Sequence, residues 1–223
     1  MLPALSFLET RVLGVLVEKE RTVPDTYPLS LNALTLGCNQ KNNRHPVSQA
    51  TEAEVQAAVD ALRPLALVIE SSGSRVMRYA HNLERGLGVS APAVALLAAL
   101  MLRGPQTPGE LRIATERLHR FADPGAVEAA LRGLAARAEG GALVAQLPRA
   151  PGAREARWAH ALSGPVEAAP EALPAAVPAS PSAGPALAAE LASLRADVTR
   201  LQRETADLRA LVARLAGDSA APR

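Results

Sequence analysis

Two segments of the chain end in nearly the same tripeptide, Tyr79-Ala80-His81 and Trp158-Ala159-His160. Before each tripeptide, apolar residues first recur at helical spacing and then form two short runs joined by a turn. The interval between the two series is too long for a solenoid repeat and fits two duplicated domains. The duplication therefore restricts the chain to folds in which one small unit of helices and a hairpin occurs twice.

The first series predicts three helices and a hairpin. Ser6 with Glu9, and Thr51 with Glu54, have the spacing of capping boxes at helix starts. The range 22–28 holds two prolines, which exclude a helix there because proline lacks an amide donor. The expected elements are helices over 6–20, 30–39 and 51–63 and a hairpin over 67–79. Three helices followed by a two-stranded hairpin is the order of a winged helix-turn-helix domain.

The second series repeats this order. Thr107-Pro108-Gly109-Glu110 combines an N-cap threonine with a proline and a glutamate at favoured positions of the first helical turn. The expected elements are helices over 90–102 and 107–117, a helix from 123, and a hairpin over 143–160. The predicted fold class is mainly α with small β-hairpins (α+β), with two tandem winged helix-turn-helix domains over 1–84 and 85–164.

The last part of the chain has a different composition. Residues 165–186 are rich in Ala and Pro, so we expect a disordered linker because little apolar burial could offset the entropy of ordering. Over 187–216, apolar residues alternate spacings of four and three, which predicts a parallel coiled-coil homodimer before a disordered tail over 217–223. The alternative is one amphipathic helix that packs on the chain's own domains. The predicted dimer interface comprises Leu187, Leu191, Leu194, Val198, Leu201, Thr205, Leu208, Val212 and Leu215.

Composition excludes several classes of protein. The formal net charge of +2 is too small for a strongly basic nucleic-acid-binding chain. The single cysteine, Cys38, cannot form an internal disulfide or a multi-cysteine zinc site. Charged residues follow the N-terminal apolar residues too closely for a signal peptide, and no apolar run approaches the length of a membrane span. We expect a cytoplasmic protein without membrane association, and we predict no cofactor.

A dense polar cluster after the second predicted helix is the first candidate for a nucleic-acid-binding surface. Its side chains suit phosphate contacts and hydrogen bonds at groove edges. The third helices suit this role less well, because acidic residues such as Glu52, Glu54 and Asp60 would oppose phosphates. The predicted nucleic-acid-binding residues are Asn39, Gln40, Lys41, Asn42, Asn43, Arg44 and His45 in the cluster, and Arg75, Arg149 and Arg154 beside the two hairpins.

Other interpretations of these residues stay open. The amides could satisfy carbonyls at a helix end, and the winged helices could dock or scaffold a protein partner instead of DNA. Catalysis is disfavoured, since a lone Cys38 late in an apolar helix is typical of a core residue even with His45 near it in sequence. The histidines His45, His81, His119 and His160 lack metal-ligand spacing, so no metal site is predicted. The prediction is a non-enzymatic binding protein.

Several long strings also carry a family resemblance. They are 18–20, Thr22, 24–25, 27–35, 38–41, 43–44, Pro46, 73–75, 102–112, 147–149, 151–152, Glu155 and His160, with Asn42, Arg154 and Trp158 as mild departures from the expected residues. On the basis of these strings, the range from residue 1 to about residue 164 resembles the YceH family of bacterial proteins. The resemblance implies tandem winged-helix domains and no established biochemical activity. The linker and the coiled coil lie outside it.

Overall fold

The computed structural model describes residues 2–71, 76–138 and 140–164, and all of them belong to one compact unit that spans Met1–Pro170. The remaining unit, Glu171–Arg223, lies outside the described residues. The predicted linker and coiled coil therefore also lie outside them, as does Arg75.

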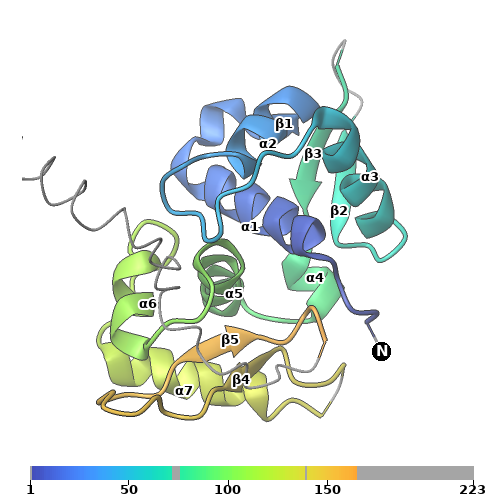
Figure 1. Cartoon of the computed structure of the whole chain (residues 1–223). Helices are drawn as coiled ribbons and strands as arrows, with labels where there is room; N and C mark the ends of the chain where they lie inside the picture. The colour runs from blue at the N-terminus through green and yellow to red at the C-terminus, as the bar shows by residue number, and fades with distance from the viewer. Residues whose placement is uncertain (1, 72–75, 139, 165–223) are drawn as a thin grey trace, which may run out of the picture. The chain divides into compact units, whose positions relative to one another are not determined.

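Residues 2–89 contain the elements of the first series (Figure 1). The predicted helix starts are confirmed, because Ser6 and Thr51 both form complete capping boxes and the Ser30 side chain accepts a hydrogen bond from the Ala33 amide. The elements are α1 (Phe7–Thr22), the 3-10 turn η1 (Pro24–Thr26), β1 (Leu29–Ser30), α2 (Leu31–Cys38), α3 (Glu52–Leu62), β2 (Val68–Ser71), β3 (Arg78–His81) and α4 (Leu83–Leu87).

The second series has the same order without the short extra elements. Thr107 forms its predicted capping box with Glu110, but the helix ends at Ala114 and not at 117. The Thr115 side chain is fully buried and donates its hydroxyl proton to the Leu111 carbonyl, which closes the helix there. The elements are α5 (Ala91–Arg103), α6 (Pro108–Ala114), α7 (Pro124–Ala135), β4 (Val144–Gln146) and β5 (Trp158–His160).

The two antiparallel sheets have matching registers. In the first, β3 lies between β1 and β2, and Tyr79 pairs with both Leu29 and Glu70. In the second, β5 pairs with β4, and Trp158 pairs with Gln146 and, through an isolated bridge, with Gln106. Leu29 and Gln106 each directly precede the N-cap residue of the following helix. The described residues thus form a mixed α+β fold in which the paired hairpin strands of the two halves have the same register.

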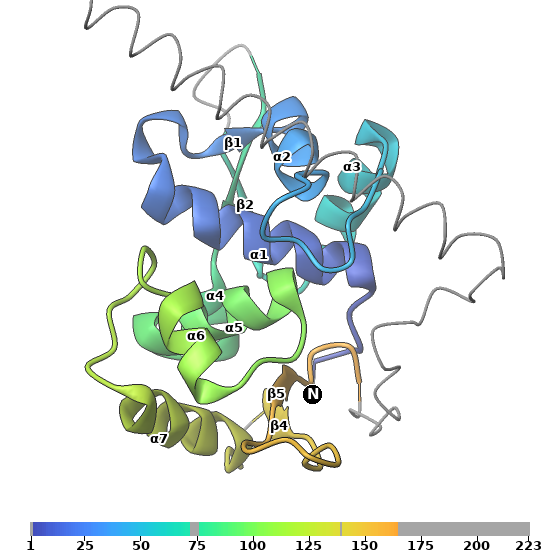
Figure 2. The same ribbon diagram turned by 60° about the vertical axis from the view of Figure 1, so that its left-hand side comes forward.

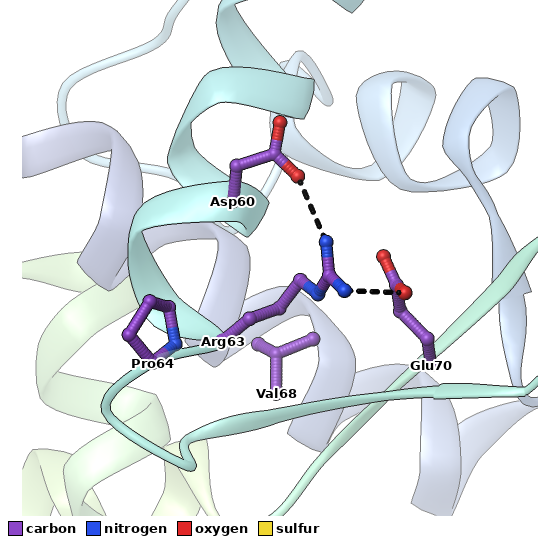
Figure 3. A pocket seen from close by; sticks show the side chains of 5 residues that line it. All are labelled: Asp60, Arg63, Pro64, Val68 and Glu70. Atoms are coloured by element: carbon purple, nitrogen blue, oxygen red, sulfur yellow. Dashed lines mark ion pairs between the residues drawn. The ribbon is translucent and has the colours of Figure 1, made fainter.

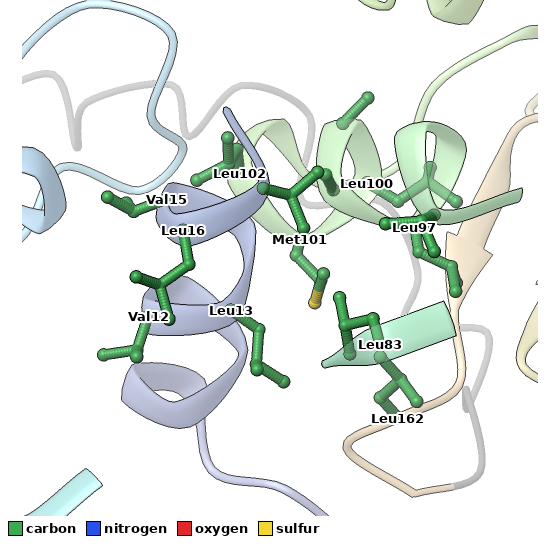
Figure 4. Packing of buried hydrophobic residues seen from close by; sticks show 14 of the residues in the cluster. Val12, Leu13, Val15, Leu16, Leu83, Leu97, Leu100, Met101, Leu102 and Leu162 are labelled. Atoms are coloured by element: carbon green, nitrogen blue, oxygen red, sulfur yellow. The ribbon is translucent and has the colours of Figure 1, made fainter. Parts of the chain in front are cut away.

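The two halves share one hydrophobic core. Helices α1 and α5, the first long helix of each half, lie side by side at its centre and pack more extensively than any other pair of described elements (Figure 1, Figure 4). A close approach makes this possible, because a Cβ atom on Gly14 would lie 2.8 Å from Cγ of Leu102. Tyr79 and Trp158, which occupy the same place in the two hairpins, are both buried and belong to one continuous cluster.

The arginines that precede these aromatics have different surroundings. Arg78 is half-buried, and its Nη1 donates to the carbonyl oxygens of Pro28 at 2.8 Å and Thr26 at 3.3 Å. Arg157 is exposed and lies 3.9 Å from the Glu110 carboxylate. The difference arises because β1 and its preceding turn lie beside β3 and offer backbone acceptors to Arg78.

Candidate functional site

Residues 39–50, which we call the 39–50 loop, connect α2 to α3 and contain the predicted polar cluster. Figure 2 shows this loop between α2 and the end of α5. A loop of this length would ordinarily be mobile, but three side chains hold it from inside the fold. These side chains decide which members of the cluster face outward.

Arg44 is the first of them, and its side chain is completely buried. Its two Nη atoms bind the Glu18 carboxylate at 3.1 and 2.6 Å, and its Nε donates to the Gly37 carbonyl at 3.0 Å. Burial alone would raise the pKa of the Glu18 carboxyl, but the hydrogen bonds and charge of Arg44 hold it below its usual value. Arg44 was predicted to bind nucleic acid, and in this structure its guanidinium is enclosed and cannot reach a phosphate.

Arg11, on α1, is the second and has 0% exposure. It donates to the carbonyl oxygens of Cys38 at 3.3 Å and Pro46 at 2.8 Å, and its guanidinium lies 4.8 Å from the centre of the Phe7 ring. Burial and the charge of Arg44 lower the pKa of Arg11 from its usual value. Both arginines bind carbonyls at the C-terminal end of α2, where the helix dipole favours positive charge.

Asn39 is the third. Its amide nitrogen donates to the Ala50 carbonyl at 2.7 Å, and its amide oxygen accepts from the Ala50 nitrogen at 2.8 Å. This reciprocal pair joins the two ends of the 39–50 loop, directly before the N-cap residue of α3. The alternative interpretation, in which amides of the cluster satisfy backbone groups near a helix end, is the arrangement observed for Asn39.

The rest of the cluster faces outward. Gln40 is exposed and accepts from Lys19 and Arg44, while Lys41 and Asn42 are exposed and make no hydrogen bond within the described residues. Asn43 is exposed with a φ of 60°, a left-handed conformation that asparagine tolerates. His45, Arg149 and Arg154 are also exposed.

The segment 102–106 connects the 39–50 loop to the second half. The His45 amide donates to the Leu102 carbonyl at 2.8 Å. Four residues later, the backbone groups of Gln106 and Trp158 exchange two hydrogen bonds of 3.0 and 2.8 Å. The loop, the end of α5 and the start of β5 are therefore held at one place, although they are far apart in the sequence.

A cavity of about 550 Å³ lies at this junction, and we call it the Arg103 cavity. It gathers basic side chains from three segments, namely His45, Arg103 and Arg157, beside one carboxylate, Glu110. Sequence reasoning missed Arg103 and Arg157, because only their position beside His45 distinguishes them from other surface arginines. The lining residues are His45, Arg103, Pro105, Gln106, Glu110, Ile113 and Arg157.

A second cavity, between α3 and β2, has the opposite balance of charge (Figure 3). Its one arginine, Arg63, forms ion pairs with Asp60 at 3.5 Å and with Glu70 at 3.0 Å. In the other half, the arginines at the third helix, α7, also have partners. Arg132 forms an ion pair with Glu128 at 2.7 Å, and Arg137 donates to the carbonyl oxygens of Leu87 and Gly88 at the C-terminal end of α4. These arginines near the third helices already bind other groups of the protein, so they are poorly placed to bind phosphates.

Cys38 is fully buried, and burial raises the pKa of its thiol to about 12. Among the described residues, no group of three or more His, Cys, Asp or Glu side chains is placed to hold a metal ion. A search of the same residues finds no helix of the length and apolar character needed to cross a membrane.

Comparison with known proteins identifies the family. A family described as "Protein of unknown function, DUF480" matches residues 5–153. The chain belongs to this family. It is 58% identical to a UPF0502 protein of Dechloromonas aromatica (strain RCB) over 212 residues, which cover 94% of this chain and 95% of that protein. It is 57% identical to a UPF0502 protein of Leptothrix cholodnii over 214 residues, which cover 96% and 95%.

The family match and the alignments with relatives differ in extent. The family match ends at residue 153, in agreement with a resemblance that stops near residue 164. The alignment with the Dechloromonas aromatica protein covers 94% of the chain and therefore continues beyond residue 164, into the range of the predicted linker and coiled coil.

Proposed function

We propose that this protein binds nucleic acid without catalysing a reaction, and that it does so through phosphate contacts at the junction of its two halves. The observation that carries the proposal is the convergence of His45, Arg103 and Arg157 around one cavity that contains a single carboxylate. A cavity whose basic side chains outnumber its carboxylates favours a polyanionic partner.

The order of elements supports tandem winged-helix domains. In each half, three helices precede a two-stranded hairpin, and a segment before the second helix pairs with the hairpin strand that carries Tyr79 or Trp158. Winged-helix proteins commonly place the third helix in the major groove. Here α3 exposes Glu52, Glu54 and Asp60, so the proposed contacts come from the 39–50 loop and the second hairpin instead.

Lys41, on the 39–50 loop, and Arg149 and Arg154, between β4 and β5, are the outer part of the proposed surface. All three side chains are exposed and have no ion pair within the described residues. Such groups suit contacts with phosphates on either side of the cavity. Base-specific recognition is not part of the proposal.

The heptad pattern over 187–216 supports a parallel homodimer, which would place two such surfaces on one duplex. Light scattering of the full chain at micromolar concentration should give the mass of a dimer. A monomer under these conditions would overturn this part of the proposal.

A salt titration of binding to random duplex DNA tests the function. Wild-type affinity should fall as salt rises, and the Lys41→Ala/Arg154→Ala variant should bind more weakly, with a salt slope smaller by about 2, since each lost phosphate contact removes about 0.9. The matched control is Arg21→Ala/Arg85→Ala, which removes the same charge from exposed positions elsewhere and should keep the wild-type slope. A wild-type protein with no salt-dependent binding would refute the proposal.

A second candidate function, docking of a protein partner, has its own supporting observation. Leu36 and Ile113 occupy the same position after their N-cap residues Ser30 and Thr107, and their exposed fractions are 65% and 66%. Exposed large aliphatic side chains at equivalent places of the two halves suit contacts with an apolar surface of a partner. A partner that co-purifies without nucleic acid should be lost in Leu36→Ser/Ile113→Ser and retained in Ile69→Ser, whose side chain is 48% exposed.

A further inference from the structure

Arg103 is the last residue of α5, a place where arginine often stabilises a helix by binding its final carbonyls. Backbone amides already bind two of those carbonyls: the Gly104 amide donates to the carbonyl oxygen of Leu100, and the His45 amide donates to that of Leu102. The Gln106 side chain donates to the carbonyl oxygens of Ala99 and Gly104 on either side of this last turn. The Arg103 side chain makes none of these bonds, so binding of the final carbonyls does not explain this arginine.

Among the described residues, the Arg103 guanidinium also has no ion-pair partner. Glu110 is the one carboxylate that lines the cavity, and its Oε2 atom accepts from the Thr107 amide at 2.8 Å in a capping box. Its Oε1 atom lies 3.9 Å from Nη2 of Arg157. Within the described part of the chain, Arg103 makes no side-chain hydrogen bond or ion pair, although it is half-buried beside a second arginine.

The half-buried Arg103 carries a positive charge that no carboxylate among the described residues pairs with, so a bound anion would lower the energy of the site. Guanidinium groups bind phosphate through two parallel hydrogen bonds, and such charge-assisted bonds are stronger than neutral ones. Pro105 and the exposed side chain of Ile113 add an apolar surface on the same cavity. A phosphate attached to a sugar matches this lining, because the charged phosphate suits the arginines and the less polar sugar suits Pro105 and Ile113.

We propose that the Arg103 cavity binds a single phosphate group of a nucleic-acid backbone, with Arg103 as the main donor and Arg157 and His45 beside it. This inference rests on the proposed function and assigns to it a central anchoring contact. The hydrogen bond from the His45 amide to the Leu102 carbonyl brings the 39–50 loop to the edge of the proposed phosphate site.

The experiment compares full-length wild type, Arg103→Ala, Arg103→Lys and the control Arg85→Ala, an exposed arginine on α4. Binding to a 12-base-pair duplex and to inorganic phosphate is measured by calorimetry. Arg103→Ala should weaken duplex binding about tenfold and reduce the salt slope by about 1, while Arg103→Lys should keep the slope and recover part of the affinity. Arg85→Ala should bind as wild type does. Thermal unfolding of Arg103→Ala should match wild type, because no bond is lost.

Each outcome has a distinct meaning. If wild type binds the duplex and Arg103→Ala binds equally well, the phosphate site is wrong and the proposed function stands. If wild type fails to bind the duplex but binds inorganic phosphate in an Arg103-dependent manner, the phosphate site stands with a free phosphate as its ligand, and the proposed function is wrong. If a glutamate-rich peptide binds through Arg103 and neither phosphate ligand does, the phosphate assignment is overturned in favour of an acidic protein partner.

Discussion

Glu18 on α1 and Arg44 in the 39–50 loop form a two-point ion pair, with Nη1–Oε1 at 3.1 Å and Nη2–Oε2 at 2.6 Å. The pair fastens the loop to the first helix, and the Arg44 side chain is 0% exposed. It connects the conformation of the proposed nucleic-acid surface to the stability of the fold.

Glu18→Gln should lower the free energy of unfolding by about 3 kcal/mol, because it leaves the buried Arg44 charge without its counterion. Equilibrium urea unfolding measures this change. The control is Glu116→Gln, which removes an exposed pair with Arg120 and should change stability by less than about 0.5 kcal/mol. Equal stability of the two variants would show that the buried pair contributes little.

Substitutions at two helical glycines should have opposite effects. In Gly14→Ala the new Cβ would lie 2.8 Å from Leu102 at the contact of α1 with α5, so we expect a net loss of about 1 kcal/mol despite better helix propensity. In Gly133→Ala, on α7, no atom lies within 4 Å of the new Cβ, and stability should rise by about 0.5 to 1 kcal/mol. Thermal unfolding compares them, and a stabilised Gly14→Ala would contradict the tight contact.

The thiol of Cys38 should be nearly inert in the folded protein. A rise of its pKa from 9.0 to about 12 leaves about a thousandfold less thiolate at neutral pH, and burial blocks access as well. Reaction with Ellman's reagent should be slow in buffer and fast in concentrated urea. The matched control is Leu36→Cys in a Cys38→Ala background, which places a thiol at an exposed position of the same helix. Rapid labelling of native wild type would show that the loop opens readily.

The stability of the fold should decrease in mildly acidic solution. Burial lowers the pKa of His160 below its usual value of 6.5, so the unfolded chain binds a proton more tightly than the folded one. The free energy of unfolding should fall as the pH decreases through about 6.5 and level off below the folded pKa. Urea unfolding across this range should show a smaller slope for His160→Leu than for wild type, and equal slopes for the two proteins would contradict the prediction.

The helix starts were determined by the sequence alone. Ser6 with Glu9, Thr51 with Glu54 and Thr107 with Glu110 all form the predicted capping boxes. Each depends on two residues three positions apart, so the physical cause is contained in a short segment. The repeated order of helices and hairpin was also readable, because the pattern of apolar residues and turns occurs twice along the chain.

Tertiary structure decided which polar residues are available. Arg44 and Lys41 look equivalent in the sequence, yet Arg44 is enclosed by a carboxylate 26 positions away and Lys41 is exposed. Arg103 lines the same cavity as His45 and Arg157 only because the fold brings the 39–50 loop and β5 to the end of α5. The energy of a charged side chain depends on its distance to other charges and to water, and folding sets these distances between segments that the sequence keeps apart.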